Sequence, residues 1–125
     1  IAAGGVETKM VKLRASHRSD AVTDLLCAGG LVVGSPTINR TMFPTVADFL
    51  CYAGGLKPQN LVGAAFGSYG WSGEAVKQIA DALVQMGAKT VSEGLKVNYV
   101  PDAEALAQCR KFGTDIACSI IENSR

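Results

Sequence analysis

The central turn of this sequence reads Phe66-Gly67-Ser68-Tyr69-Gly70-Trp71-Ser72-Gly73. The short apolar run before it, residues 61–66, is typical of a buried strand. Residues 74–84 after it repeat apolar side chains with the i, i+3, i+4, i+7 spacing of an amphipathic helix. The stretch is therefore predicted to be a strand-to-helix turn of an α/β unit.

This turn carries groups that suit a flat aromatic ligand. Open α/β sheets bind ligands in turns at the carboxyl ends of their strands. The glycines let the backbone come close to a ligand, and Tyr69 and Trp71 offer π faces. Ser72 is predicted to cap the following helix. The turn alone leaves a second interpretation open, in which it is only a turn whose aromatic rings fold back over the core.

Another loop, residues 35–39, is predicted at the same sheet edge. Leu31-Val32-Val33-Gly34 is wholly apolar and short, as in a central parallel strand. It runs into Ser35-Pro36-Thr37-Ile38-Asn39, which Pro36 stiffens and which offers hydroxyl, amide and apolar side chains. An ordinary loop has the same composition. Two such loops on one edge nevertheless favour a binding site more than either loop alone.

The remaining segments complete an alternating order of strands and helices. Apart from the segments already described, we expect edge strands at 6–13 and 95–100 and helices at 19–28, 44–53 and from Pro101-Asp102 to the end, with Ser19 capping the first helix. The order β-α-β-α-β-α-β-α predicts a parallel sheet with helices on both faces. We see no internal repeat and no linker, and 125 residues suit a single domain.

Composition and motifs exclude several function classes. The formal net charge of +1 argues against nucleic-acid binding and a basic membrane patch, and no apolar run has the length of a membrane span. Neither a P-loop pattern nor G-x-G-x-x-G is present, which argues against nucleoside triphosphate and Rossmann dinucleotide sites.

The cysteines and the single histidine argue against a metal site. Cys27, Cys51, Cys109 and Cys118 form no C-x-x-C pair and fall in predicted helices, so we expect buried, reduced thiols and a cytoplasmic location. His17 is the only histidine, whereas catalytic iron and zinc sites need several histidine and carboxylate ligands.

The two loops resemble those of the flavodoxin-like domain of flavodiiron proteins (A-type flavoproteins). The resemblance covers essentially the whole chain and is carried by Gly34–Asn39, Ala65–Gly73, Phe43-Pro44-Thr45-Val46-Ala47, Gly55-Leu56-Lys57-Pro58-Gln59-Asn60 and Tyr99-Val100-Pro101-Asp102. It implies a doubly wound α/β fold with three α-β-α layers and a five-stranded parallel sheet of order 2-1-3-4-5. It also implies noncovalent binding of FMN.

The resemblance also implies which residues contact the flavin. They are Ser35, Pro36, Thr37, Ile38, Asn39, Gly67, Ser68, Tyr69, Gly70, Trp71 and Gly73. Trp71 would stack on the ring, and backbone N–H groups between Tyr69 and Trp71 would meet its carbonyl oxygens. No catalytic acid, base or nucleophile and no metal ligand is expected, and Asp48, Glu74 and Asp81 are interpreted as solvated helix charges.

By the same resemblance, the protein is an oxidoreductase that transfers electrons through FMN. Rubredoxin, or a reduced nicotinamide or deazaflavin system, would be the donor. A diiron site in a separate metallo-β-lactamase-like domain would reduce dioxygen or nitric oxide. Such proteins form head-to-tail homodimers, which implies a partner surface around Met42 and Trp71.

One departure from the family pattern concerns the N-terminal end. The family's first strand, its T-x-Y-G-x-T phosphate loop and most of its first helix have no counterpart before Ile1-Ala2-Ala3-Gly4-Gly5. We therefore expect residues 1–125 to be an N-terminally incomplete flavodoxin-like domain of a longer polypeptide. This leaves two other interpretations open: a flavin-free structural or interaction module in a redox complex, and a free-standing flavodoxin or flavodoxin-like quinone reductase.

Overall fold

A computed structural model describes residues 1–124 of the chain. Its elements, in chain order, are the 3-10 helix η1 (Ala2–Gly4), α1 (Arg18–Leu25), β1 (Gly30–Gly34), α2 (Pro44–Gly55), β2 (Val62–Tyr69), α3 (Glu74–Gln85), β3 (Lys89–Thr90), β4 (Leu95–Asn98) and α4 (Ala103–Asn123). All strand pairs are parallel. The predicted alternation of strands and helices is therefore confirmed from residue 18 onward.

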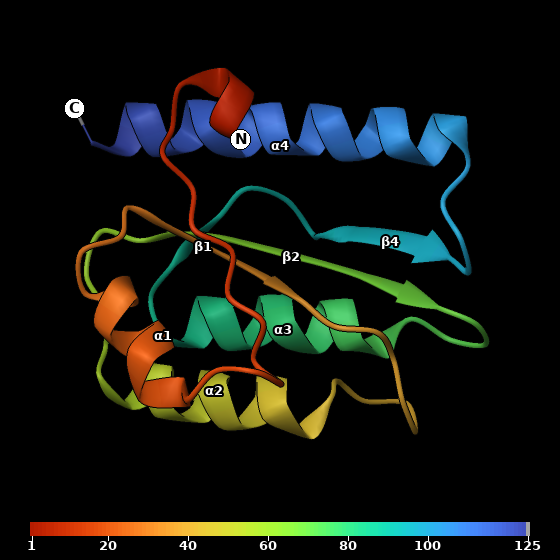
Figure 1. Ribbon diagram of the computed structural model, residues 1–125, viewed down its shortest axis with the longest axis horizontal. Coiled ribbons are helices and arrows are strands. Elements are labelled where there is room, and N and C mark those ends of the chain that lie inside the picture. Colours follow the sequence, from red (N-terminus) through yellow and green to blue (C-terminus); the bar gives the residue numbers. More distant parts are fainter. Residues whose placement is uncertain (125) are drawn as a thin grey trace.

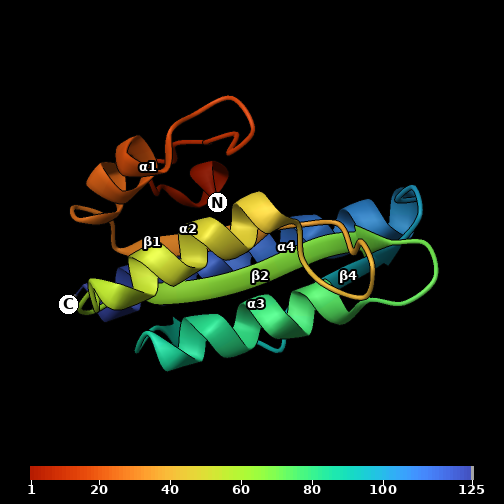
Figure 2. The same ribbon diagram turned by 90° about the horizontal axis from the view of Figure 1, so that it is seen from below.

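The sheet lies between two helical layers, as predicted. Figures 1 and 2 show α4 on one face and α1, α2 and α3 on the other. β2 is the central strand, and it pairs with β1 from Gly30↔Val62 to Gly34↔Phe66. On its other side β2 pairs first with β3 and then with β4, which act as two halves of one interrupted strand. This is a doubly wound α/β sheet in which both of the site-forming strands end at the same edge.

The core lies between the sheet and the layer of α1, α2 and α3. The first half of β2, residues 62–65, is buried, which explains its uninterrupted apolar sequence. On α3, Ile79 and Leu83 are fully buried and each contributes about 1.5–3 kcal/mol through its burial. The facing helix α2 adds Val46, Phe49, Leu50 and Ala53 to the same cluster. The two helices that follow the predicted site loops are thus both anchored by the core.

The predicted edge strand at 6–13 is not observed. This segment crosses from η1, beside α4, past β1 to the layer of α1 (Figure 1). Val11 and Leu13 are partly buried against the core, so the apolar half of the pattern has a packing role. A strand also needs a neighbour that satisfies its backbone N–H and C=O groups, and none of the described strands pairs with it.

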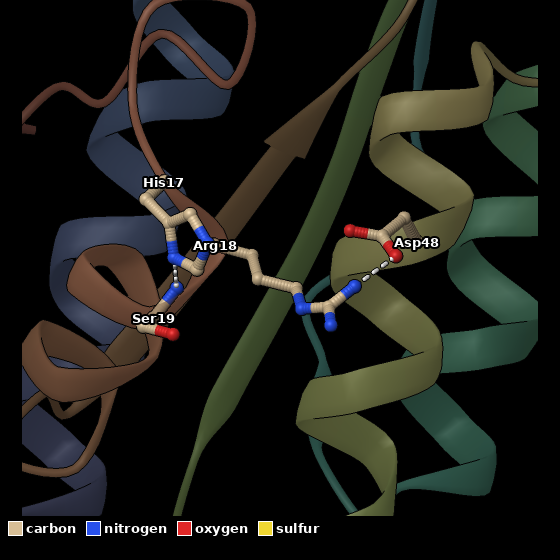
Figure 3. A network of polar contacts seen from close by, with 4 residues as sticks. All are labelled: His17, Arg18, Ser19 and Asp48. Atoms are coloured by element: carbon tan, nitrogen blue, oxygen red, sulfur yellow. Dashed lines mark hydrogen bonds and ion pairs between the residues drawn. The ribbon is translucent and has the colours of Figure 1, made fainter.

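The start of α1 is held by polar contacts to α2 (Figure 3). His17, and not Ser19 as predicted, is the N-cap residue, and its Nδ1 accepts a hydrogen bond from the Ser19 N–H at 3.1 Å. Arg18 Nη1 lies 2.6 Å from Asp48 Oδ1, and the guanidinium lies 5.1 Å from the centre of the Tyr52 ring. Since the ion pair is about half exposed, it orients α1 more than it stabilises the fold. Asp48 is therefore a paired charge and not only a solvated one.

The cysteines are free thiols, but the prediction that they are buried was wrong. Cys27, Cys51 and Cys118 are exposed and Cys109 is half-buried. Cys27 also follows the end of α1 and does not lie within it. In α2 and α4, the apolar neighbours that suggested burial occupy the side of the helix that faces the sheet, whereas the thiols lie on other faces.

The long helix α4 begins with a side-chain cap that can be tested. Asp102 Oδ1 accepts a hydrogen bond from the Ala105 N–H at 2.8 Å. Asp102→Ala is expected to lower the free energy of unfolding by about 1 kcal/mol, because one N-terminal N–H loses its partner. Urea unfolding measures this change. Asp102→Asn keeps a capping oxygen and should stay within a few tenths of the wild type, so an equal loss in both variants would contradict the capping role.

Candidate functional site

The two predicted site loops leave neighbouring strands and remain in contact. The Ser35 N–H donates to the Phe66 carbonyl at 3.2 Å, and the Thr37 N–H donates to the Ser68 carbonyl at 3.2 Å. These bonds continue the β1–β2 pairing beyond the end of β1. β2 itself extends to Tyr69, so residues 67–69 belong to the strand and not to the turn as predicted. The site is therefore built on an extended strand pair.

A glycine permits this close contact between the two segments. A Cβ atom at Gly67 would overlap the Ser35 carbonyl oxygen and approach Val76 Cγ2 within 3.2 Å. One step earlier in the pairing, the Phe66 ring occupies the space that a Cβ at Gly34 would need. Glycine is therefore required at position 67, where backbone atoms obstruct a Cβ, whereas at Gly34 a Cβ would displace the half-exposed Phe66 ring. The sequence pattern alone did not indicate this packing reason.

The loop that follows β1, called the first loop from here on, is stabilised by its own polar groups. Ser35 is 3 % exposed, and its Oγ accepts from the Phe43 N–H at 2.9 Å and donates to the Pro36 carbonyl at 2.8 Å. Ile38 and Thr41 exchange two backbone hydrogen bonds of 2.9 Å. The Ser35 hydroxyl is thus used within the loop and its N–H within the strand pairing, so Ser35 contributes mainly by shaping the loop.

The tip of the first loop is a two-residue hairpin turn. Its central residues Asn39 and Arg40 have φ angles of 50° and 60°, as in a type I′ turn. Asparagine tolerates this left-handed conformation, but arginine does so only at a cost of about 1–2 kcal/mol. The turn leaves Ile38 and Asn39 exposed at the sheet edge.

The loop that follows β2, called the second loop from here on, presents aromatic rings. Trp71 is 92 % exposed and Tyr99 is 70 % exposed. The Tyr99 N–H donates to the Tyr69 carbonyl at 2.8 Å, and a Cβ at Gly70 would lie 3.1 Å from the Tyr99 ring. Tyr99 thus lies against the second loop at the end of β4. Sequence reasoning did not include it among the site residues, although it follows an alternating strand that ends at the same edge.

The start of α3 is held by the first loop. Gly73 is the N-cap residue and has no side-chain cap, so the predicted cap by Ser72 was wrong. The hydroxyl of Thr37 instead accepts a hydrogen bond from the Ala75 N–H at 3.3 Å. A residue of one loop therefore satisfies an N-terminal N–H of the helix that begins at the end of the other.

Glu74, the first residue of α3, differs from the solvated charge that was predicted. Its Oε2 is buried and has no hydrogen-bond partner among the described residues. A hydrogen bond from the Ser72 side chain and one from its own backbone lower the pKa of Glu74, with smaller contributions from the charges of Arg40 and Lys96. An acceptor oxygen here suits a ligand N–H or hydroxyl, whereas a phosphate would meet a like charge.

The structure brings the predicted site residues to one edge, with different exposures. Ser35 is buried; Thr37, Gly67, Tyr69 and Gly73 are half-buried; Pro36, Ile38, Asn39, Ser68, Gly70 and Trp71 are exposed. Exposed π faces, small residues and a strand-end backbone fit the ring of a flavin. Residues 1–124 contain no group of three or more potential metal ligands and no helix long and apolar enough to cross a membrane.

The contact at Gly67 yields a stability prediction. Gly67→Ala is expected to lower the free energy of unfolding by about 1–3 kcal/mol, because the new methyl group forces the Ser35 backbone away from β2. Chemical denaturation measures the loss. Gly55→Ala is the matched control, since a Cβ at Gly55 meets nothing within 4 Å. Equal stability of the two variants would show that the strand ends are not tightly packed.

Glu74 yields a pH prediction. A pKa below its ordinary value of 4.5 means that the ionised carboxylate stabilises the fold above about pH 4.5, and that this contribution is lost as the pH falls through the lowered pKa. Glu74→Gln should therefore show a smaller fall in stability than the wild type when urea unfolding is repeated at decreasing pH. An equal fall in the stability of the two proteins over this pH range would contradict the stabilising role of the Glu74 carboxylate.

Comparisons with known proteins agree with this geometry. The flavodoxin family model matches residues 1–113. The nitric oxide reductase of Moorella thermoacetica is 41 % identical over 123 residues, which are 98 % of this chain and 31 % of that protein. The solved rubredoxin oxygen:oxidoreductase of Desulfovibrio gigas superposes with a TM-score of 0.95 at 37 % identity, over 98 % of this chain and 30 % of that one.

A third similar protein is itself named a flavodiiron protein. The flavodiiron protein of Giardia intestinalis superposes with a TM-score of 0.92 at 29 % identity, over 98 % of this chain and 31 % of that chain. The sequence thus spans less than a third of the length of each of these three proteins. The flavodoxin domain of flavodiiron proteins binds FMN, so the predicted cofactor is confirmed. The chain therefore belongs to the flavodoxin family, and it is homologous to the flavodoxin-like domain of flavodiiron proteins.

Proposed function

We propose that this chain binds the isoalloxazine ring of FMN between its two site loops and serves as an electron-transfer domain. FMN supplies the redox chemistry, since it accepts and releases electrons one or two at a time. The protein binds the ring, orients it and sets its polar surroundings. The proposal assigns one side and edge of the ring to residues 35–39 and the other side to residues 67–73, with Trp71 as the stacking aromatic.

One observation carries this proposal. The two loops are joined by the hydrogen bond between Thr37 and Ser68, at 3.2 Å, while Trp71 beside them is 92 % exposed. Leaving the large apolar ring of Trp71 in water costs free energy. Because the loop that carries Trp71 is held between β2 and α3, it cannot fold this ring back over the core. A flat ligand that covers Trp71 would remove this cost.

The wider reaction is proposed from the relatives. Two of them are named as a nitric oxide reductase and a rubredoxin oxygen:oxidoreductase. We propose that electrons from rubredoxin, or from a reduced nicotinamide or deazaflavin donor, pass through FMN to a diiron site. That site would lie in a separate metallo-β-lactamase-like domain of the same or a neighbouring chain and reduce dioxygen or nitric oxide.

A homodimeric arrangement is part of the proposal. In a head-to-tail dimer, the flavin of one subunit would face the metal site of the other, with contacts around Met42 and Trp71. The exposed Val100, 84 % accessible next to Tyr99, extends the apolar surface at this edge. Analytical ultracentrifugation of the full-length protein tests the oligomeric state.

The visible absorption spectrum of the purified full-length protein tests the cofactor. Flavin bands, followed by release of FMN on heating and its identification by mass, support the proposed function. A colourless protein that takes up no added FMN would contradict it, and would favour a flavodoxin-like module used only for subunit contacts.

Trp71 yields the mutational prediction. Trp71→Ala is expected to weaken FMN binding by about 1–3 kcal/mol, the loss of one aromatic stack and its buried area. A fluorescence titration with FMN measures the dissociation constant. Trp71→Phe should recover part of the affinity, because it keeps a π face. Tyr52→Ala is a control, since Tyr52 is a half-exposed ring on α2 that packs with Arg18. Unchanged affinity in Trp71→Ala would remove this residue from the site.

A further inference from the structure

Gln78 connects the first loop to α3 through three hydrogen bonds. Its Oε1 accepts from the Thr41 hydroxyl at 2.8 Å and from the Met42 N–H at 3.1 Å. Its Nε2 donates to the Arg40 carbonyl at 3.1 Å. One side chain thus contacts three consecutive residues that are 36–38 positions away in the sequence. Gln78 was not among the residues predicted to form the site.

The loop that Gln78 contacts needs external support. The bonds between Ile38 and Thr41 determine the internal shape of the hairpin turn, but they do not fix its direction relative to the sheet. Its central residue Arg40 adopts the left-handed conformation at φ 60°, which L side chains disfavour. Such a conformation persists only where surrounding contacts determine it. Gln78 makes contacts of this kind immediately beside the turn.

These bonds make α3 a common support for both site loops. The helix begins where the second loop ends, and its Ala75 N–H binds Thr37 of the first loop. Gln78 lies about one turn further along and holds the far end of that loop. Figures 1 and 2 both show the loop between β1 and α2 beside the first turns of α3. The relative position of the two loops therefore depends on one helix.

We infer that Gln78 is a positioning residue for the flavin site, which holds Ile38 and Asn39 at the distance from the second loop that the ring requires. The inference rests on the proposed function, because it assumes that FMN binds between these loops. Gln78 itself acts through the loop and need not touch the flavin. A loop already held in its bound conformation binds a ligand more tightly, because less freedom is lost on binding.

Substitution of Gln78 by methionine separates this role from folding. Gln78→Met keeps the unbranched shape and the helix propensity but removes all three hydrogen bonds. In the full-length protein we expect the dissociation constant for FMN to rise about tenfold and both one-electron reduction potentials of bound FMN to shift. In the flavin-free protein, hydrogen exchange at the Met42 amide should become faster, because that N–H loses its acceptor.

Two further variants complete the experiment. Gln78→Glu keeps an acceptor for Thr41 and Met42 but cannot donate to the Arg40 carbonyl, so it should recover part of the FMN affinity. Gln85→Met makes the same exchange at an exposed position two turns along α3 and should bind FMN like the wild type.

The outcomes distinguish this inference from the proposed function. Wild-type affinity and wild-type potentials in Gln78→Met would overturn the inference alone, as would an equal loss in Gln85→Met. A wild-type protein that binds no FMN would overturn both. Wild-type binding, a loss in Gln78→Met and partial recovery in Gln78→Glu would support both.

Discussion

The candidate site depends on the close approach of two backbones at Gly67 and Ser35. Parallel strands of ordinary composition diverge into their loops once pairing ends. Here the absence of a side chain at Gly67 lets the Ser35 carbonyl lie against β2, and two further N–H donors, of Ser35 and Thr37, continue the pairing. The hairpin turn and the aromatic loop both continue from this point, so the place where each begins depends on these few contacts. On its other side the same part of β2, Phe66 to Tyr69, is supported by its pairing with β4.

The helix α3 supplies the second constraint, because it links the two loops from outside the sheet. Its buried residues Ile79 and Leu83 anchor it to the core, so its first turns form a rigid platform. Thr37 and Gln78 attach the first loop to that platform, while the second loop leads directly into it. A change in the packing of α3 would consequently move both loops together, and would alter the site without any change in the residues that face the ligand.

The sequence predicted most of the fold, because the spacing of apolar residues and the glycines at the ends of helices and strands depend directly on local structure. The buried half of β2 was recognisable from its short apolar run, and the amphipathic α3 from its helical period. The prediction of a strand at 6–13 was wrong, because an alternating pattern does not reveal whether a partner strand is present. The site loops were found from their composition, but Tyr99, Glu74 and Gln78 were not. The roles of Tyr99 and Gln78 arise from contacts across 25 or more residues, which no local pattern encodes. The buried oxygen of Glu74 depends on how the start of α3 packs, which the sequence does not show either.

The distribution of backbone strain points to the same edge of the sheet. Among residues 1–124, five residues other than glycine have positive φ: Asn39, Arg40, Lys57, Asn60 and Tyr99. Lys57 and Asn60 lie in the connection that enters β2, where a sharp turn accounts for them. Asn39, Arg40 and Tyr99 lie at the carboxyl edge of the sheet, in the segments that follow β1 and β4. The type I′ turn requires these angles at Asn39 and Arg40, and left-handed conformations of this kind persist only where surrounding contacts determine them. The hydrogen bonds of Gln78 and of the Tyr99 N–H offset the cost of these conformations at the positions where it arises.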